Sequence, residues 1–180
     1  MKKLLITTNE NGLTIKADTG ARFTKKLYAG HSLFEREWDP VEWYYYTLVN
    51  MKFSVKKGEK IQLRLDQNSM LKHYRFATFK RPKEYKHPHW SKKAISIDNA
   101  RDIKANYTGI KASDCFKDLR SQFKTLQFEY NGPDAQKDAN GKVTNLHYFA
   151  YDLHLKIPNT EHRLWIGPVI RNNGGLGGEP

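Results

Sequence analysis

The sequence is poor in cysteine: among 180 residues it contains only Cys115. A single cysteine excludes an internal disulfide bond and a structural zinc site built from several cysteines. Such sparing use of cysteine is typical of proteins in a reducing compartment, and we therefore expect a cytoplasmic protein. A secreted protein without disulfide bonds would have the same composition.

Long hydrophobic runs are also missing. No stretch approaches the roughly 20 consecutive apolar residues that a membrane-spanning helix needs. The apolar run near the N-terminus, Leu4 to Ile6, ends at Thr7 and is too short for the hydrophobic region of a signal peptide. We therefore expect neither a membrane partner nor a cleaved leader.

Acidic residues are scarce relative to basic ones, with 19 Asp and Glu against 31 Lys and Arg and a formal net charge of +12. Such an excess favours anionic partners. Aromatic residues make up 13% of the chain, whereas disordered segments are poor in them, so we expect a folded core rich in Phe, Tyr and Trp. The length fits one domain, which we place at residues 1–171, followed by a flexible glycine-rich tail at 172–180.

Short strands dominate the hydrophobic pattern. Asn11-Gly12 can supply the positive φ angles of a tight turn, which predicts a hairpin of residues 4–8 and 13–17. Alternating or β-branched and aromatic residues predict further strands at 43–49, 51–55, 61–65, 73–79, 126–130, 148–157 and 164–170. Pro82 and Pro88 interrupt regular structure, so residues 80–93 are expected to form an exposed loop.

One clear helix is predicted over residues 113–124, where Ser113 or Asp114 can cap the N-terminus. The apolar residues at helical spacing are Phe116, Leu119 and Phe123. Residues 98–107 are ambiguous and would fit a second short helix. Many short strands with so few helices predict a mainly β protein, an antiparallel β-sandwich with one or two short helices inserted; a barrel is the alternative.

Two segments carry a resemblance to known folds. Residues 51–65, two strands around Gly58-Glu59, resemble the strand–turn–strand step of cupredoxin-like sandwiches. Residues 147–151 and 164–170 together are similar to the final hairpin of the PixA/AidA inclusion-body family, with Gly167-Pro168 where that family typically has Asp-Pro. The resemblance implies a sandwich fold and gives no active residue to transfer. It does not imply a blue-copper site, because Cys115 lies in the predicted helix rather than near the last strands.

The strongest functional signal is the segment from Lys72 to Lys93, which we call the basic–aromatic segment. Eight Lys or Arg residues stand there against one acid, Glu84, so the segment carries +7 of the net charge. Cations attract phosphate, carboxylate or sulfate groups, and aromatic rings between them can stack on bases or sugars. The residues expected to bind the anion are Arg75, Lys80, Arg81, Lys83, Tyr85, Lys86, Trp90, Lys92 and Lys93, the cations by phosphate contact and Tyr85 and Trp90 by stacking.

An ordinary structural explanation stands beside this one. Lys and Arg are common on protein surfaces, and Tyr74, Phe76 or Phe79 would fit the core face of a strand. We favour the core for Phe76, whereas a proline-broken loop is rarely buried and would leave Tyr85 and Trp90 partly exposed. No helix-turn-helix, RNA-recognition or zinc-finger pattern is present, so nothing supports the reading of specific bases.

The histidines suggest two further kinds of site, a metal site and a hydrolytic active site. His87-Pro88-His89 offers only two imidazoles within a cationic surrounding, and a third ligand would have to come from elsewhere, so we expect no metal and no cofactor. Three histidines, His147, His154 and His162, cluster in sequence near the last predicted strands with Asp152 and Glu161. A nuclease or hydrolase could use a histidine paired with a carboxylate. We favour a solvated sheet face there, and no nucleophile or phosphate-binding glycine loop accompanies it.

Three functions remain open at this point. The favoured one is a non-enzymatic protein that binds an anionic macromolecule, nucleic acid before others, without strong sequence specificity. The second is a structural or assembly protein in which the same segment or the tail contacts an acidic protein surface or a second copy of the chain. The third is a small nuclease that depends on His147, His154 or His87.

Overall fold

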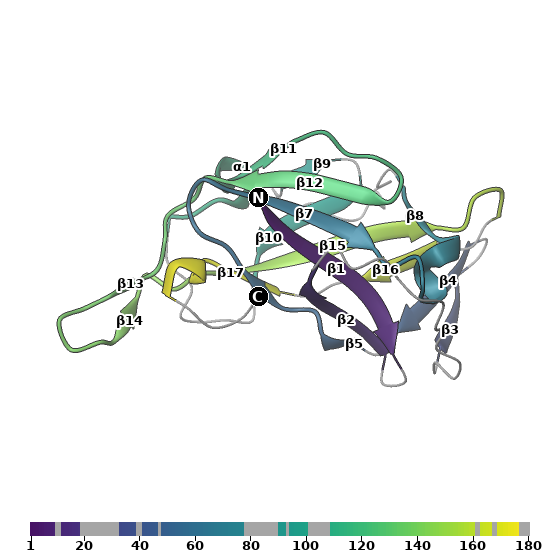
Figure 1. The fold of residues 1–180 in the computed structure, drawn as a ribbon, viewed down its shortest axis with the longest axis horizontal. Coiled ribbons are helices and arrows are strands. Elements are labelled where there is room, and N and C mark those ends of the chain that lie inside the picture. Colours follow the sequence, from purple (N-terminus) through teal and green to yellow (C-terminus); the bar gives the residue numbers. More distant parts are fainter. Residues whose placement is uncertain are drawn as a thin grey trace.

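The computed structural model describes residues 1–9, 12–18, 33–38, 41–46, 48–77, 90–92, 94–100, 109–160, 163–166 and 169–176. Two large β-sheets account for most of them (Figure 1). The prediction of a mainly β protein is therefore confirmed.

The first sheet has six strands in the order β11-β12-β7-β1-β2-β5. Their bounds are β1 Lys2–Asn9, β2 Gly12–Ala17, β5 Leu48–Asn50, β7 Glu59–Leu65, β11 Phe116–Asp118 and β12 Thr125–Tyr130. The predicted first hairpin is present, with β1 and β2 antiparallel and Asn9 opposite Gly12. However, β1 pairs with β7 and β2 with β5 in parallel, so the sheet is mixed rather than purely antiparallel.

The second sheet has nine strands arranged around the long strand β15. Their bounds are β3 Leu33–Trp38, β4 Val41–Tyr46, β6 Phe53–Ser54, β8 Arg75–Phe76, β9 Trp90–Lys92, β10 Ile95–Asn99, β15 Tyr148–Lys156, β16 Arg163–Ile166 and β17 Val169–Arg171. Four strands pair with β15, each in antiparallel orientation: β8, β10, β16 and β17. The single strand expected at 164–170 is thus two strands, β16 and β17, that bond to different parts of β15.

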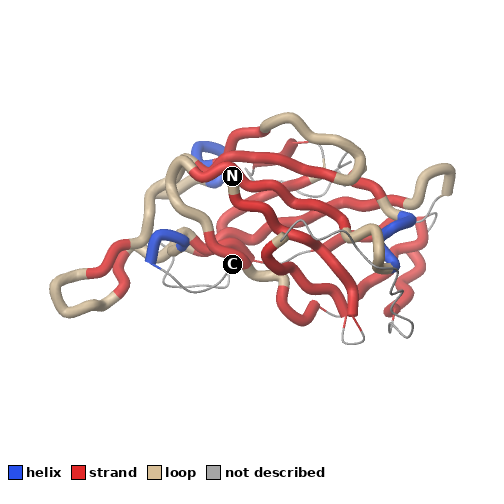
Figure 2. The backbone as a smooth tube through the Cα atoms, in the orientation of Figure 1, coloured by secondary structure: helices blue, strands red, loops and turns tan. Residues whose placement is uncertain are grey.

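The hydrophobic core lies between the two sheets. Figures 1 and 2 show the strands of the six-stranded sheet crossing in front of those of the nine-stranded sheet. Alternate residues of β7, β12 and β15 point into this layer and are fully buried: Ile61, Leu63, Leu65, Leu126, Phe128, Tyr130, Phe149, Tyr151, Leu153 and Leu155. Rings from both sheets meet there, with the centroids of Phe116 and Phe149 5.0 Å apart at nearly right angles. The arrangement is that of a β-sandwich.

The helix expected over 113–124 is largely wrong. Only one turn forms, α1 Ala112–Cys115, and the chain then extends into β11. The cap is Lys111, without a side-chain hydrogen bond, and not Ser113 or Asp114. Pairing of β11 with β12 outweighs helical periodicity because it places Phe116 opposite Tyr130 and buries it in the aromatic core.

The strand expected at 73–79 is shorter in the described part of the chain. A short 3-10 helix, η1 Met70–His73, begins with Ser69, whose hydroxyl accepts a hydrogen bond from the Leu71 amide at 3.1 Å. Tyr74 follows in extended conformation, and β8 contains only Arg75 and Phe76. Residues 78–89 lie outside the described residues.

Two further features lie outside the sheets. Between β12 and β15 the chain forms a small hairpin, β13 Gln136–Lys137 and β14 Val143–Thr144, which projects away from both sheets (Figure 1). After β17 the chain forms a second 3-10 turn, η2 Gly174–Leu176. The packed domain therefore continues past residue 171, because Asn172 is fully buried and the Gly174 amide donates to the Val55 carbonyl at 3.0 Å; residues 177–180 of the expected tail lie outside the described residues.

Within the described part of the chain, no helix is long and apolar enough to cross a membrane.

Candidate functional site

The basic–aromatic segment is described at its two ends, residues 72–77 and 90–92. The predicted anion-binding residues that lie outside the described residues are Lys80, Arg81, Lys83, Tyr85, Lys86 and Lys93. Trp90 and Lys92 belong to β9, which pairs with β10 so that Trp90 lies opposite Ile97 and Lys92 opposite Ile95. The loop expected over 80–93 is therefore wrong at its C-terminal end, because this edge of the nine-stranded sheet provides backbone partners that local proline signals do not reveal.

Strand β8 fixes the first end of the segment to the sheet. Arg75 pairs with Lys156 and Phe76 with Leu155 on β15, and the Ala77 amide donates to the His154 carbonyl at 3.0 Å. The ring of Phe76 is 7% exposed, which confirms its expected place in the core. Arg75 is half-buried at the neighbouring position, so β8 places a cation beside an aromatic core residue.

A turn between β11 and β12 reaches across to β8. Its ends are held by the Gln122 amide, which donates to the Thr125 carbonyl at 2.7 Å, and by the reciprocal bond at 3.3 Å. The carbonyl of Phe123 accepts from the Phe76 amide at 2.8 Å. The side chain of Phe123 is 68% exposed, so this turn presents an aromatic ring to solvent next to the basic–aromatic segment.

The side chains of Arg75 and Phe123 meet at this crossing. The guanidinium carbon of Arg75 lies 4.9 Å from the centroid of the Phe123 ring, within the range of a cation–π interaction. The contact restrains two side chains that would otherwise be mobile at the surface. It thereby places a positive charge beside a flat apolar ring.

Lys124 fastens the turn to the start of the segment. Its ammonium donates to the carbonyl of Lys72 at 2.7 Å and also to the carbonyl of Tyr74. Partial burial lowers the pKa of Lys124, because the charged form loses part of its hydration. This lysine holds the backbone rather than offering its charge to a ligand.

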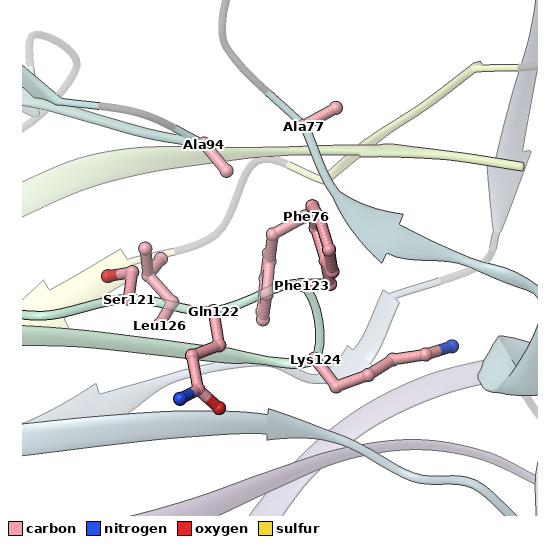
Figure 3. Close-up of a pocket in the computed structure, with 8 residues that line it drawn as sticks. All are labelled: Phe76, Ala77, Ala94, Ser121, Gln122, Phe123, Lys124 and Leu126. Carbon is pink, nitrogen blue, oxygen red and sulfur yellow. The ribbon is translucent and has the colours of Figure 1, made fainter. Parts of the chain in front are cut away.

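A pocket of about 640 Å³ opens between β8, the turn and the start of β10. Its lining residues are Phe76, Ala77, Ala94, Ser121, Gln122, Phe123, Lys124 and Leu126. Figure 3 shows the two phenylalanines in the middle of this group and the amine of Lys124 directed away from it. Mostly apolar walls with a few polar groups at the margin are typical of ligand sites.

The sequence reasoning missed Phe123 and Lys124 as site residues. It assigned Phe123 to the buried face of a helix, and no Gly, Pro or Asn marks the turn at 119–125. The one available signal was indirect: a helix over 113–124 would run straight into the alternating strand of Leu126, Phe128 and Tyr130 with no residues left for a connection.

Two of the histidines considered for catalysis, His147 and His154, are buried. His147 is 1% and His154 is 7% exposed. Tyr148, Asp152 and Lys156, on the same face of β15 as His154, are half-buried, so the solvated face expected there is wrong at His154. The His147 ring lies 2.9 Å from the Asn99 side-chain oxygen, measured from Nε2, and packs on Phe149 with centroids 4.5 Å apart. His87, His89 and His162 lie outside the described residues, and among those that are described no three His, Cys, Asp or Glu side chains gather as a metal site would require.

Cys115 is also buried, at the end of α1. Burial, with a smaller contribution from the Asp114 carboxylate, raises the pKa of its thiol to about 11. The thiol is therefore protonated at neutral pH and lacks the thiolate that a cysteine nucleophile needs.

Comparisons with models of protein families, with curated proteins and with solved structures found no match to this chain.

Proposed function

We propose that this protein is a non-enzymatic binding protein that holds nucleic acid without strong sequence preference. The contact surface consists of the basic–aromatic segment together with Phe123. Its phosphate contacts come from the cations Arg75, Lys80, Arg81, Lys83, Lys86, Lys92 and Lys93, with Tyr85 and Trp90 as additional stacking residues.

The observation that carries this proposal is the pair of Arg75 and the exposed Phe123 ring, 4.9 Å apart. An exposed aromatic side chain beside cations is the combination used by proteins that bind bases by stacking and phosphates by charge. The surrounding segment adds a net charge of +7. An acidic protein surface would use the charge but would leave the exposed ring without a partner.

Lack of sequence preference follows from the same features. Phosphate contacts supply affinity without reading the sequence, and stacking accepts every base because every base has a flat face.

The direct test is binding of a random-sequence oligonucleotide, followed by fluorescence anisotropy from low to physiological salt. We expect tight binding at low salt and a steep linear fall of log K with log salt, because bound counterions are released on association. A protein that fails to bind even at low salt would contradict the proposal.

A second candidate function, assembly with another copy of this chain, is favoured by the projecting hairpin β13–β14. Residues 136–143, which form most of this hairpin, are all exposed. An isolated two-stranded hairpin is only marginally stable. Its base is nevertheless fixed: Asn172 donates through Nδ2 to the carbonyls of Pro133 and Asn145 at 3.1 and 3.0 Å. An exposed arm that is fixed at its base suits strand addition to a neighbouring sheet edge.

Light scattering over a range of protein concentrations tests this second candidate. We expect Val143→Asp, on the exposed strand β14, to shift any oligomer toward monomer, with Lys142→Gln at the tip as the control. A protein that is monomeric at all concentrations would contradict it.

A further inference from the structure

We propose that the pocket beside Phe123 takes one unpaired base of a single-stranded nucleic acid. This inference rests on the proposed function and narrows it from nucleic acid in general to the single-stranded form. It also adds a defined pocket for one base to a surface that otherwise contacts phosphates and stacks on bases.

The shape and lining of the pocket fit a flat apolar group. Its volume of about 640 Å³ lies within the usual range of small-ligand sites. Its apolar lining consists of Phe76, Ala77, Ala94, Phe123 and Leu126. A base has two flat faces that stack well on aromatic side chains, whereas a charged phosphate would lose hydration against these apolar walls.

The charges near the pocket fit the backbone of a strand whose base has entered it. Arg75 lies on the Phe123 ring and therefore next to where the phosphate of an inserted nucleotide would run. The ammonium of Lys124 is committed to the carbonyls of Lys72 and Tyr74. Arg75 is thus the cation we assign to the phosphate, and Lys124 is a positioning residue that keeps the turn in place.

The polar groups at the margin are not arranged to identify the base. Figure 3 shows the amide of Gln122 and the amine of Lys124 pointing away from the two phenylalanines. The Ser121 hydroxyl oxygen accepts a hydrogen bond from the Gln127 amide at 3.1 Å. Walls that contact base faces, without donors and acceptors directed at base edges, predict similar affinity for different bases.

Preference for single strands follows from access. A base in a duplex is stacked and paired, and it must be extruded at a cost of a few kcal/mol before it can enter a pocket. A base in a single strand carries little of this cost. Duplex can therefore use the surrounding cations but not the pocket.

The experiment compares one fluorescently labelled mixed-sequence oligonucleotide, single-stranded and annealed to its complement, at low salt. For Phe123→Ala we expect single-strand affinity to fall by about 5- to 150-fold, the usual effect of removing one stacking side chain, while duplex affinity stays the same. Tyr148→Ala is the matched control, because the Tyr148 ring also lies beneath a guanidinium, that of Arg171 at 5.3 Å, but at the opposite end of β15 from Arg75.

Two further measurements separate stacking from simple apolar contact. A single strand containing 2-aminopurine should lose fluorescence on binding the wild-type protein and keep it with Phe123→Ala. Phe123→Leu should behave like Phe123→Ala, because leucine fills space without a ring. If Phe123→Leu binds single strands as the wild type does, the pocket takes an apolar group other than a stacked base.

Different results would contradict this inference and the proposed function. If the wild type binds both forms with steep salt dependence and Phe123→Ala changes neither affinity, the pocket does not hold a base and the proposed function stands. If the wild type binds neither form at low salt, both are wrong.

Discussion

The guanidinium carbon of Arg75 lies 4.9 Å from the centroid of the Phe123 ring. A second pair of this kind, Arg171 over Tyr148 at 5.3 Å, lies at the opposite end of β15, since Arg75 pairs with Lys156 and Arg171 with Tyr148 itself. Tyr148 is half-buried, whereas Phe123 is exposed. Only the first pair therefore offers a large ring surface to a ligand, and it is the one beside the basic–aromatic segment.

Charge at Arg75 should matter more for binding than charge elsewhere. We expect Arg75→Gln to weaken single-strand binding and to reduce the slope of log K against log salt by about 0.7, the value of one phosphate contact in a single strand. The measurement is anisotropy at several salt concentrations. Lys142→Gln removes the same charge at an exposed position of the projecting hairpin, and an equal effect of both variants would show that only net charge counts.

Phe116 and Phe123 share one face of the helix predicted over residues 113–124, but in the folded protein they should differ in their contribution to stability. Phe116 is buried among the rings of Phe128, Tyr130 and Phe149, so we expect Phe116→Ala to lower the free energy of unfolding by about 3–5 kcal/mol. Phe123→Ala should cost about 1 kcal/mol or less, because an exposed ring loses little beyond its contact with Arg75. Urea unfolding measures the loss of unfolding free energy in both variants. Equal losses would support the predicted helix, in which both residues are buried.

Asn172 should be essential to the fold although it lies in the expected tail. Its Oδ1 accepts from the His147 amide at 2.7 Å, and its Nδ2 donates to two carbonyls. Asn172→Ala leaves buried groups without partners at about 1–3 kcal/mol each, so we expect a total loss of about 3 kcal/mol or more. Asn140→Ala, at an exposed turn, is the control and should stay within about 0.5 kcal/mol. A mobile tail would make the two variants alike in urea unfolding.

Stability should fall in alkaline solution, in part because of Cys115. Its pKa is about 11 in the folded protein against 9.0 for the unperturbed thiol, so above pH 9 the unfolded chain releases this proton and the folded one holds it. The folded state is then disfavoured progressively through pH 11, by about 2 kcal/mol at pH 10.5.

The variant Cys115→Ala tests whether ionisation of this thiol lowers the stability of the folded protein at high pH. The variant should start less stable than the wild type because a buried side chain is shortened, but it should lose about 2 kcal/mol less between pH 8 and pH 10.5. Burial also raises the pKa values of Tyr130 and Tyr151. The free energy of unfolding should therefore still fall in alkaline solution for both the wild type and Cys115→Ala. Equal declines in urea unfolding would mean that the thiol ionises as easily in the folded state.

Several strands could be predicted from the sequence because their signals are local. The alternation in residues 61–65 and 126–130 gives β7 and β12 with every apolar residue buried, and Asn11-Gly12 marks the first hairpin. A strand has a period of two whatever its neighbours are, so this pattern survives without knowledge of the partner strand.

Other features depend on partners far away in the chain. Residues 116–123 have helical spacing, yet β11 forms because β12 is available beside it. His154 follows the alternation that predicts a solvated face, but it is buried on β15, a strand with neighbours on both sides. In both cases the outcome was set by which elements pack together.

The sequence by itself determined a mainly β chain with an aromatic core and a concentrated positive charge at residues 72–93, because composition and period-two patterning are properties of the chain alone. Only the tertiary structure decided that β1 and β7 run parallel, that Asn172 belongs to the packed domain, and that Phe123 lies against Arg75. Each of these depends on contacts between distant segments, whose free energy appears only when the two sheets have come together.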